Sequence, residues 1–187
     1  MSTKPTILNK KTIATSRLFR IESLEIEFSN GVQRNYERLA RGHSNGAVLV
    51  VPLLDDETVL LIREYSAGVH RYELGLPKGK VDAGETFLEA ANRELKEEVG
   101  YGANQLHHLS TFSLAPSYLE HTTEIIVAQD LYAERLLGDE PEELEVVEWK
   151  LSDINELLMT GECTEARSIA ALFMTVEYLK TLRDVKN

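Results

Sequence analysis

The strongest constraint on this chain is a set of glycine and charged residues that stand at fixed distances along one short stretch. That stretch also carries the end signals of a helix. Thr86 and Glu89 have the spacing of a capping box, and Gly100 stands where a left-handed residue commonly ends a helix. We therefore predict a helix from about Thr86 to Val99. The spaced residues are Gly79, Glu85, Arg93, Glu94, Glu97, Glu98 and Gly100.

Three carboxylates of this predicted helix share one face. An α-helix advances about 100° per residue, so Glu94, Glu97 and Glu98 fall within an arc of about 100°. Alone, such charges could form a solvated face partly neutralised by Arg93 and Lys96, since like charges one turn apart cost only a few tenths of a kcal/mol. The whole spaced set, however, coincides by chance only about once in 10⁸ registers. The spacing therefore favours a functional cluster.

The N-terminal part of the chain has the pattern of a small β-arm. Residues 18–39 alternate as two strands do, and Asn30-Gly31 between them is a strong hairpin signal because both residues tolerate positive φ. Polar and turn-forming residues follow at 41–46. We predict a boundary near residue 43, with an N-terminal β-hairpin arm at 1–43 and a main domain at 44–187, as suits a chain of 187 residues.

The main domain is predicted to be α/β. Residues 47–51 and 58–62 are apolar throughout, so we expect central strands, paired as a second hairpin and covered by helices on both faces. Further strands are expected at 106–114, 124–128 and 146–149. Helices are expected at about 152–159 and after Thr164, the latter with a core-facing stripe. The stripe is Ile169, Leu172, Phe173, Val176 and Leu179.

Composition excludes several classes of function. The formal net charge of −11 and the isoelectric point near 5.0 argue against binding to nucleic acid or to anionic membranes, and an anionic substrate would need a mediating cation. The longest apolar run, 47–54, is too short to cross a bilayer, and the start lacks a secretory signal. Cys163 stands alone, so no disulfide can close within the chain and we expect a buried thiol. A cytoplasmic protein is predicted.

The spaced residues resemble the Nudix box of the Nudix hydrolase family, which runs here from Gly79 to Tyr101. Tyr101 stands where the family usually has a bulky aliphatic residue. The order of strands and helices is similar to the family's α/β/α sandwich with a mixed β-sheet. Segments 72–75, 115–118 and 128–132 also resemble the branch that cleaves ADP-containing compounds.

The resemblance implies a site for Mg²⁺, with Mn²⁺ as an alternative. Diphosphate hydrolysis brings water to a phosphorus ringed by negative oxygens, and hard divalent cations with carboxylate ligands suit that task. By resemblance Glu94 and Glu98 are the main ligands, with Glu97 as a further or water-mediated ligand. The carbonyl oxygen of Lys78 is expected to be another ligand, and Glu142 an auxiliary one.

Catalytic residues also follow from the resemblance. Arg93 is expected to orient the acidic cluster, and Glu85 either supports it or stabilises the start of the helix. The general base should come from an acidic loop at 139–143, where we expect Glu140 to serve. Glu120 and Glu124 are the alternatives if the loop lies elsewhere.

The substrate is expected to be ADP-ribose, NADH or a short diadenosine polyphosphate, cleaved to release AMP. Arg63, Glu73 and Pro116 are the expected substrate contacts by resemblance. Lys78 departs from the alanine of many ADP-ribose-cleaving relatives. The resemblance further implies a homodimer in which the arm contacts a second copy. The alternatives are a non-catalytic sensor with the same fold and a hydrolase of a different nucleoside diphosphate compound.

Overall fold

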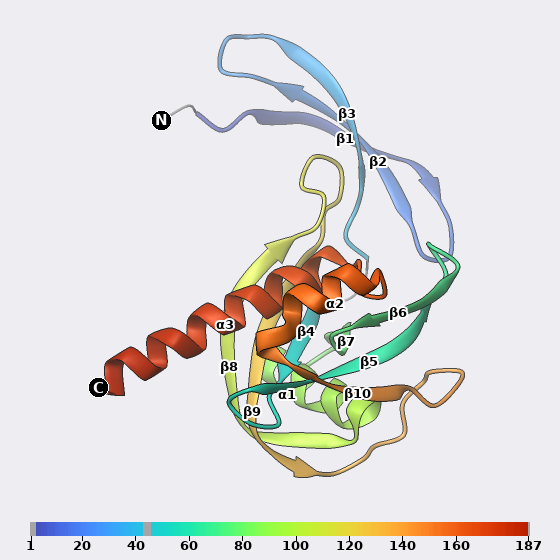
Figure 1. Ribbon diagram of the computed structural model, residues 1–187. Coiled ribbons are helices and arrows are strands. Elements are labelled where there is room, and N and C mark those ends of the chain that lie inside the picture. The colour runs from blue at the N-terminus through green and yellow to red at the C-terminus, as the bar shows by residue number, and fades with distance from the viewer. Residues whose placement is uncertain (1–2, 43–45, 187) are drawn as a thin grey trace. The chain divides into compact units, whose positions relative to one another are not determined.

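The computed structural model describes residues 3–42 and 46–186 and is drawn in Figure 1. The chain divides into two compact units. One consists of the described part of residues 1–44 together with Ser113–Thr122, and the other of the described part of residues 45–112 and 123–187. The boundary predicted at residue 43 lies outside the described residues.

The first unit contains an antiparallel sheet of three strands in the order β1-β2-β3. They are β1 (Thr6–Thr15), β2 (Arg20–Glu27) and β3 (Gln33–Leu39). The predicted turn joins β2 to β3, and Gly31 there has a φ of +79°. Strand β1 was not predicted. Every residue of β1 is exposed, so burial imposes no alternation of apolar and polar residues that a sequence pattern could reveal.

The second unit contains two sheets, in the orders β10-β5-β6 and β7-β4-β9-β8. In the second of these, β4 runs parallel to β9 and antiparallel to β7, so the sheet is mixed, as predicted. The strands are β4 (Ala47–Pro52), β5 (Thr58–Ser66), β6 (Arg71–Gly75), β7 (Lys78–Lys80), β8 (Tyr101–Ser113), β9 (Thr122–Ala133) and β10 (Glu145–Lys150).

The predicted hairpin between 47–51 and 58–62 is wrong. Strands β4 and β5 lie in different sheets; between them, an isolated bridge joins Leu53 to Val59, and the Leu54 N–H donates to the Thr58 carbonyl (2.9 Å). The turn between them is closed locally, because Asp55 accepts hydrogen bonds from the Glu57 N–H (2.8 Å) and the Thr58 hydroxyl (3.1 Å). Periodicity reveals that a strand is buried on both faces, but it does not reveal which strand is its neighbour.

Helices cover both faces of the central strands, as predicted. Leu49 and Val51 of β4 belong to the core beneath α2 and α3, whereas Val48 and Val50 belong to the core beneath α1. The helical elements are α1 (Phe87–Glu94), η1 (Leu95–Val99), η2 (Leu151–Asp153), α2 (Ile154–Thr160) and α3 (Ala166–Lys186). Figure 1 shows α1 and the α2–α3 pair as separate layers.

Two expectations for the C-terminal region are resolved. Cys163 is buried, as expected, and burial raises the pKa of its thiol to about 11. Phe173, assigned to the core-facing stripe of α3, is instead 41% exposed, and Ala171 is buried. No helix of residues 3–42 and 46–186 is long and apolar enough to span a bilayer.

Candidate active site

The acidic helix begins where the sequence predicts. Thr86 accepts a hydrogen bond from the Glu89 N–H (3.2 Å), and Glu89 accepts one from the Thr86 N–H (2.8 Å), which completes the capping box. Its last turn is not α-helical. Residues Leu95–Val99 form a π-helical turn, closed by the Gly100 N–H donating to the Leu95 carbonyl, and Gly100 has a φ of +85°. Such turns are frequent at functional sites.

The predicted carboxylates of this helix line one cavity of about 570 Å³. Glu94 and Glu98 are only 7% and 4% exposed, which is rare for charged residues and requires partners or neutralisation. Acidic side chains outnumber basic ones around the cavity. Its lining is Glu64, Lys78, Gly79, Lys80, Asp82, Arg93, Glu94, Glu97, Glu98, Leu137, Gly138, Asp139 and Glu140.

Strand β7 forms the wall opposite the acidic helix. The Lys78 N–H donates to Glu98 Oε2 over 2.8 Å. Gly79 leaves room for the Glu94 carboxylate, because a Cβ at Gly79 would lie 1.8 Å from its atoms. The fixed spacing of Gly79 was seen in the sequence, but not that a glutamate would be its neighbour.

Burial makes the two inner carboxylates hold their protons more tightly. It raises the pKa of Glu98 to about 8, in spite of the Lys78 N–H that favours the charged form. Burial also raises the pKa of Glu94, although Arg93 opposes this shift. A divalent cation would favour the charged forms, so the site is suited to exchanging protons for a metal ion.

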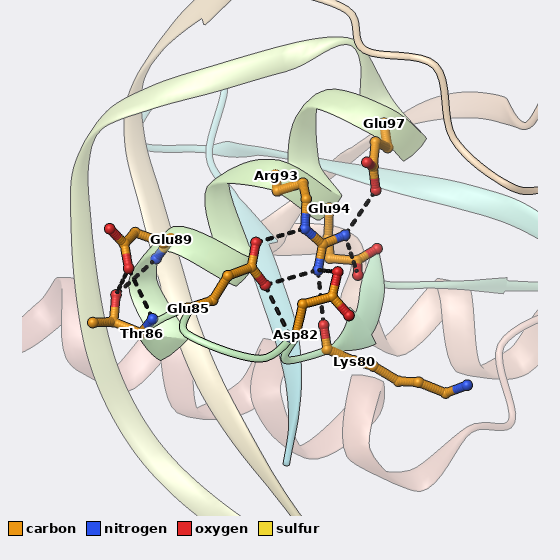
Figure 2. Close-up of polar contacts among 8 residues, drawn as sticks. All are labelled: Lys80, Asp82, Glu85, Thr86, Glu89, Arg93, Glu94 and Glu97. Carbon is orange, nitrogen blue, oxygen red and sulfur yellow. Dashed lines mark hydrogen bonds and ion pairs between the residues drawn. The ribbon is translucent and has the colours of Figure 1, made fainter. Parts of the chain in front are cut away.

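Arg93 lies at the centre of the acidic cluster. Its guanidinium has five N–H donors, and Figure 2 shows it surrounded by acceptors. The hydrogen bond with Glu85 is the largest of the causes that raise the pKa of Arg93 far above its ordinary value. The acceptors are Glu85 Oε1 (2.8 Å) and Oε2 (3.1 Å), Glu94 Oε1 (2.8 Å), Glu97 Oε2 (2.9 Å) and the Lys80 carbonyl (2.8 Å).

Glu85 acts on this cluster through Arg93. It lies before α1 and also accepts a hydrogen bond from the Asp82 N–H (3.0 Å). The hydrogen bond from Arg93 lowers the pKa of Glu85, so this carboxylate stays charged and holds the guanidinium in place. The side chain is a support for the acidic cluster.

The oxygen atoms around the cavity are suitable ligands for a hard divalent cation. The buried groups, Glu94 and Glu98, offer oxygen ligands on one rigid helix, and Glu97 is beside them. Among the described residues, no three or more His, Cys, Asp or Glu side chains are already arranged to hold a metal ion. The hydrogen bonds from Arg93 hold Glu94 and Glu97 in other positions, so cation binding would require these carboxylates to turn.

The acidic loop contributes to the same cavity. Glu140 lines it. Gly138 lies between Glu140 and the acidic helix, and a Cβ at Gly138 would not fit because it would lie 2.1 Å from Glu140 Oε2. Glu142 does not line the cavity. Its carboxylate accepts a hydrogen bond from the Tyr72 hydroxyl (2.7 Å) on β6.

The alternative bases predicted from the sequence have partners elsewhere. Glu120, in the first unit, is 3.0 Å from Arg38 Nη1. Glu124 contacts His108 Nε2 (2.7 Å) and accepts a hydrogen bond from the Thr111 hydroxyl. Within the second unit, Glu124 does not line the acidic cavity whereas Glu140 does, which favours Glu140 over Glu124.

Two of the expected substrate contacts, Arg63 and Glu73, do not line the acidic cavity. Arg63 pairs with Glu145 (2.8 Å) and Glu162 (3.2 Å). Glu73 is buried and accepts two hydrogen bonds from Thr164, both 2.9 Å. Their assignments remain predictions.

Pro116 belongs to the first unit. There it lines a cavity of about 470 Å³ together with residues of the β-arm such as Leu24 and Tyr36. Its assignment as a substrate contact also remains a prediction.

Sequence reasoning missed Glu64 and the side chain of Lys78 in this cavity. Glu64 lies on the face of β5 that turns toward the acidic helix, and it forms an ion pair with the Lys78 ammonium. A charged residue directly after an apolar strand was the only signal for Glu64. For Lys78 the resemblance points only to the carbonyl oxygen and gives no task to the ammonium group.

Comparisons with known proteins agree with this geometry. The sequence matches the family model of the NUDIX domain over residues 43–173 and that of the NudE-type Nudix hydrolase N-terminal domain over residues 5–38. The chain therefore belongs to the Nudix hydrolase family. Members of this family generally need a divalent metal such as Mg²⁺.

Individual relatives match over nearly the whole chain. The ADP compounds hydrolase NudE of Escherichia coli (strain K12) is 55% identical, over 95% of this chain and 94% of its own. The ADP-ribose pyrophosphatase of Bacillus subtilis (strain 168) is 28% identical, over 88% of this chain and 91% of its own. A crystal structure of an ADP compounds hydrolase superimposes with a TM-score of 0.89 at 53% identity, covering 97% of both chains. This agreement supports the predicted fold.

Proposed function

We propose that this protein is a Mg²⁺-dependent hydrolase that cleaves the diphosphate linkage of ADP-containing compounds. The observation that carries the proposal is the convergence of Glu94, Glu97 and Glu98 from one helix with Glu140 from a distant loop around one cavity. The name of the similar Escherichia coli protein, an ADP compounds hydrolase, supports the substrate class. ADP-ribose, NADH and short diadenosine polyphosphates are the proposed substrates, with AMP as a product.

Each residue has a proposed task. Glu94, Glu98, Glu97 and the Lys78 carbonyl would hold the cation, with Mn²⁺ as a possible substitute for Mg²⁺. The bound cation would neutralise the diphosphate and lower the pKa of a water molecule. Arg93 keeps Glu94 and Glu97 on the same side of the helix through its Nη1 atom.

Glu140 is the proposed general base. It would accept the proton of the attacking water, since it is the carboxylate of the loop that lies beside Glu97 at the cavity. We also propose that Arg63, Glu73 and Pro116 contact the ADP portion of the substrate. Arg63 would then exchange at least one of its two glutamate partners for the ligand.

The proposed assembly is a cytoplasmic homodimer in which the N-terminal arm contacts a second copy. The arm exposes large apolar side chains, including Ile7 (49%), Ile13 (47%) and Phe19 (56%). Strands β1 and β3 are also the edges of their sheet, where a partner could pair. Light scattering of the full chain should give twice the 21.1 kDa mass. A monomeric mass at micromolar concentration would refute the dimer.

Product analysis tests the proposed reaction. The protein is incubated with Mg²⁺ and a panel of ADP-ribose, NADH, diadenosine polyphosphates and a nucleotide sugar without adenine, and AMP release is measured. Glu98→Gln should abolish AMP release, while Glu177→Gln, on the exposed surface of α3 beside Lys180, should not change it. Equal rates for wild type and Glu98→Gln would refute the hydrolase. Binding of ADP-ribose without cleavage by wild type would support the sensor instead.

A further inference from the structure

Residues 134–144, which contain the acidic loop at 139–143, are attached to the rest of the second unit at both ends. At its start, the Leu136 N–H donates to the Lys96 carbonyl (3.1 Å), and the Glu134 N–H donates to the Gly100 carbonyl (3.1 Å). Both acceptors belong to the end of the acidic helix or its cap. At its far end, Glu142 accepts the hydrogen bond from Tyr72. The loop is thus held between the acidic helix and β6.

The stretch between these attachments carries the proposed base. Within the part of the chain that the structure describes, residues 137–141 form no hydrogen bond or ion pair of their own. Their position over the cavity is therefore set by the flanking residues: the backbone bonds of Glu134 and Leu136 before them, and after them the Tyr72–Glu142 bond and the start of β10 at Glu145. Glu140 is two residues from Glu142, so loss of the second attachment would release Glu140 first.

Tyr72 is well placed to serve as an anchor. It lies opposite Tyr65 in the register of β5 and β6, and the two rings meet edge-on with centroids 5.7 Å apart. Tyr65 itself uses its hydroxyl on His70 (2.6 Å) and has no part in the loop. The Glu142 hydrogen bond raises the pKa of Tyr72, so the phenol remains a donor at neutral pH.

We propose that Tyr72 is a positioning residue, whose hydroxyl holds Glu142 and thereby keeps Glu140 over the acidic cavity. This inference rests on the proposed function of Glu140. It gives Glu142 a different task from the metal ligand expected by resemblance. A Glu142 carboxylate bound to Tyr72 fixes the loop, whereas a ligand to the cation would have to face Glu94 and Glu98.

Steady-state kinetics with Mg²⁺ and ADP-ribose separate these two tasks. Tyr72→Phe and Glu142→Ala should each lower kcat by about tenfold with little change in KM, the size expected for residues that orient a site from outside it. The double variant should be no slower than either single variant, because both remove the same hydrogen bond. Tyr65→Phe and Glu143→Ala are the matched controls and should retain wild-type kcat.

The conservative variant Glu142→Gln gives the sharpest contrast. Its amide oxygen can still accept from Tyr72, so positioning predicts near wild-type kcat and an unchanged Mg²⁺ concentration for half-maximal activity. A metal ligand would instead lose activity in Glu142→Gln as in Glu142→Ala, with both variants requiring more Mg²⁺. Loss of activity in Glu142→Gln would overturn the proposal. Multiplicative losses in the double variant would also overturn it, and so would wild-type kcat in Tyr72→Phe.

Hydrogen–deuterium exchange makes the test independent of catalysis. Peptides covering residues 134–144 should exchange faster in Tyr72→Phe than in Tyr65→Phe, while the rest of the second unit is unchanged. Equal exchange in both variants would refute the attachment. If wild type released no AMP while exchange still differed, the proposed function would fail and the attachment would stand.

Discussion

The acidic helix and the acidic loop are both rich in carboxylates, yet they differ in how the fold holds them. Glu94 and Glu98 are buried on a capped helix. The Lys78 N–H of the neighbouring strand donates to Glu98, and Arg93 of the same helix donates to Glu94. The loop at 139–143 has irregular backbone, and within it the Glu142 carboxylate accepts a hydrogen bond from the Tyr72 hydroxyl.

The difference shows what converts a run of charge into a site. Burial raises the pKa of Glu94 and Glu98, and hydrogen bonds from Arg93 and from the Lys78 N–H hold these carboxylates close together before any ligand arrives. The loop contributes Asp139 and Glu140 to the cavity, and the position of these carboxylates must be maintained from outside. Variants of the two regions should therefore differ in both the size and the kind of their effects.

The largest effect is expected at the helix. Glu98→Gln should lower kcat by about 10³-fold or more, because the loss of a ligand removes several kcal/mol of stabilisation of the transition state. AMP release under saturating Mg²⁺ measures this. The loop control, Glu143→Gln, should be nearly normal. A comparable loss in the control would mean that total negative charge matters more than burial.

The loop base should come next. Glu140→Gln is expected to lower kcat by about 10² while leaving the Mg²⁺ requirement unchanged, since a base acts on a proton rather than on the cation. A Mg²⁺ titration of AMP release distinguishes the two. If Glu140→Gln raised the Mg²⁺ requirement as Glu98→Gln does, both regions would be binding the metal.

A substitution in β7 should disturb the helix carboxylate without changing the helix. The added Cβ of Gly79→Ala would meet the Glu94 carboxylate at 1.8 Å, so the flexible side chain must move away. We expect a loss of kcat of about 10–100-fold, with little change in Tm. Gly68→Ala is the control, because nothing lies within 4 Å of its Cβ position. Wild-type kcat in Gly79→Ala would show that the position of Glu94 is not critical.

The smallest effect is on stability without metal. The folded protein raises the pKa of Glu98 from 4.5 to about 8, so the folded state binds a proton more tightly than the unfolded state. The contribution of Glu98 to the free energy of unfolding therefore falls as pH rises from about 4.5 to 8.

Calorimetry in the presence of a chelator tests this sign. Between pH 5 and pH 8.5, wild type should lose a few degrees of Tm more than Glu98→Gln does. Mg²⁺ should restore wild type at the higher pH, where it replaces the proton. Parallel pH dependence of the two proteins would show that Glu98 is not the titrating group.

The sequence predicts the helix far better than its surroundings. Thr86, Glu89 and Gly100 act within a few residues of each other, so their spacing alone defines the helix ends. The π-helical turn at 95–99 depends on packing and leaves no such mark. The hydrogen bond of Glu142 to Tyr72 joins distant parts of the chain, and no local pattern in the loop announces its partner.

The same distinction applies to the strands. The apolar stretches 47–51 and 58–62 are correctly predicted as buried strands, but their pairing is decided by competition among all strands of the unit. Strand β1 is missed because it is exposed on all its residues. Arg63 and Glu73 are expected to contact substrate, which stays a prediction; the sequence could not reveal their partners Glu162 and Thr164, which come from the other end of the chain.

The parallel register of β4 and β9 has a consequence for how the protein is made. Ala47 pairs with Thr123, and Pro52 pairs with Ala128. One edge of β4 therefore stays unpaired until a much later segment of the chain is available. Contacts between such distant segments slow folding because a long loop must close first. A nascent chain that ended before Thr123 would thus carry the complete acidic helix but no finished sheet beneath it. Hydrolytic competence should accordingly emerge late in synthesis.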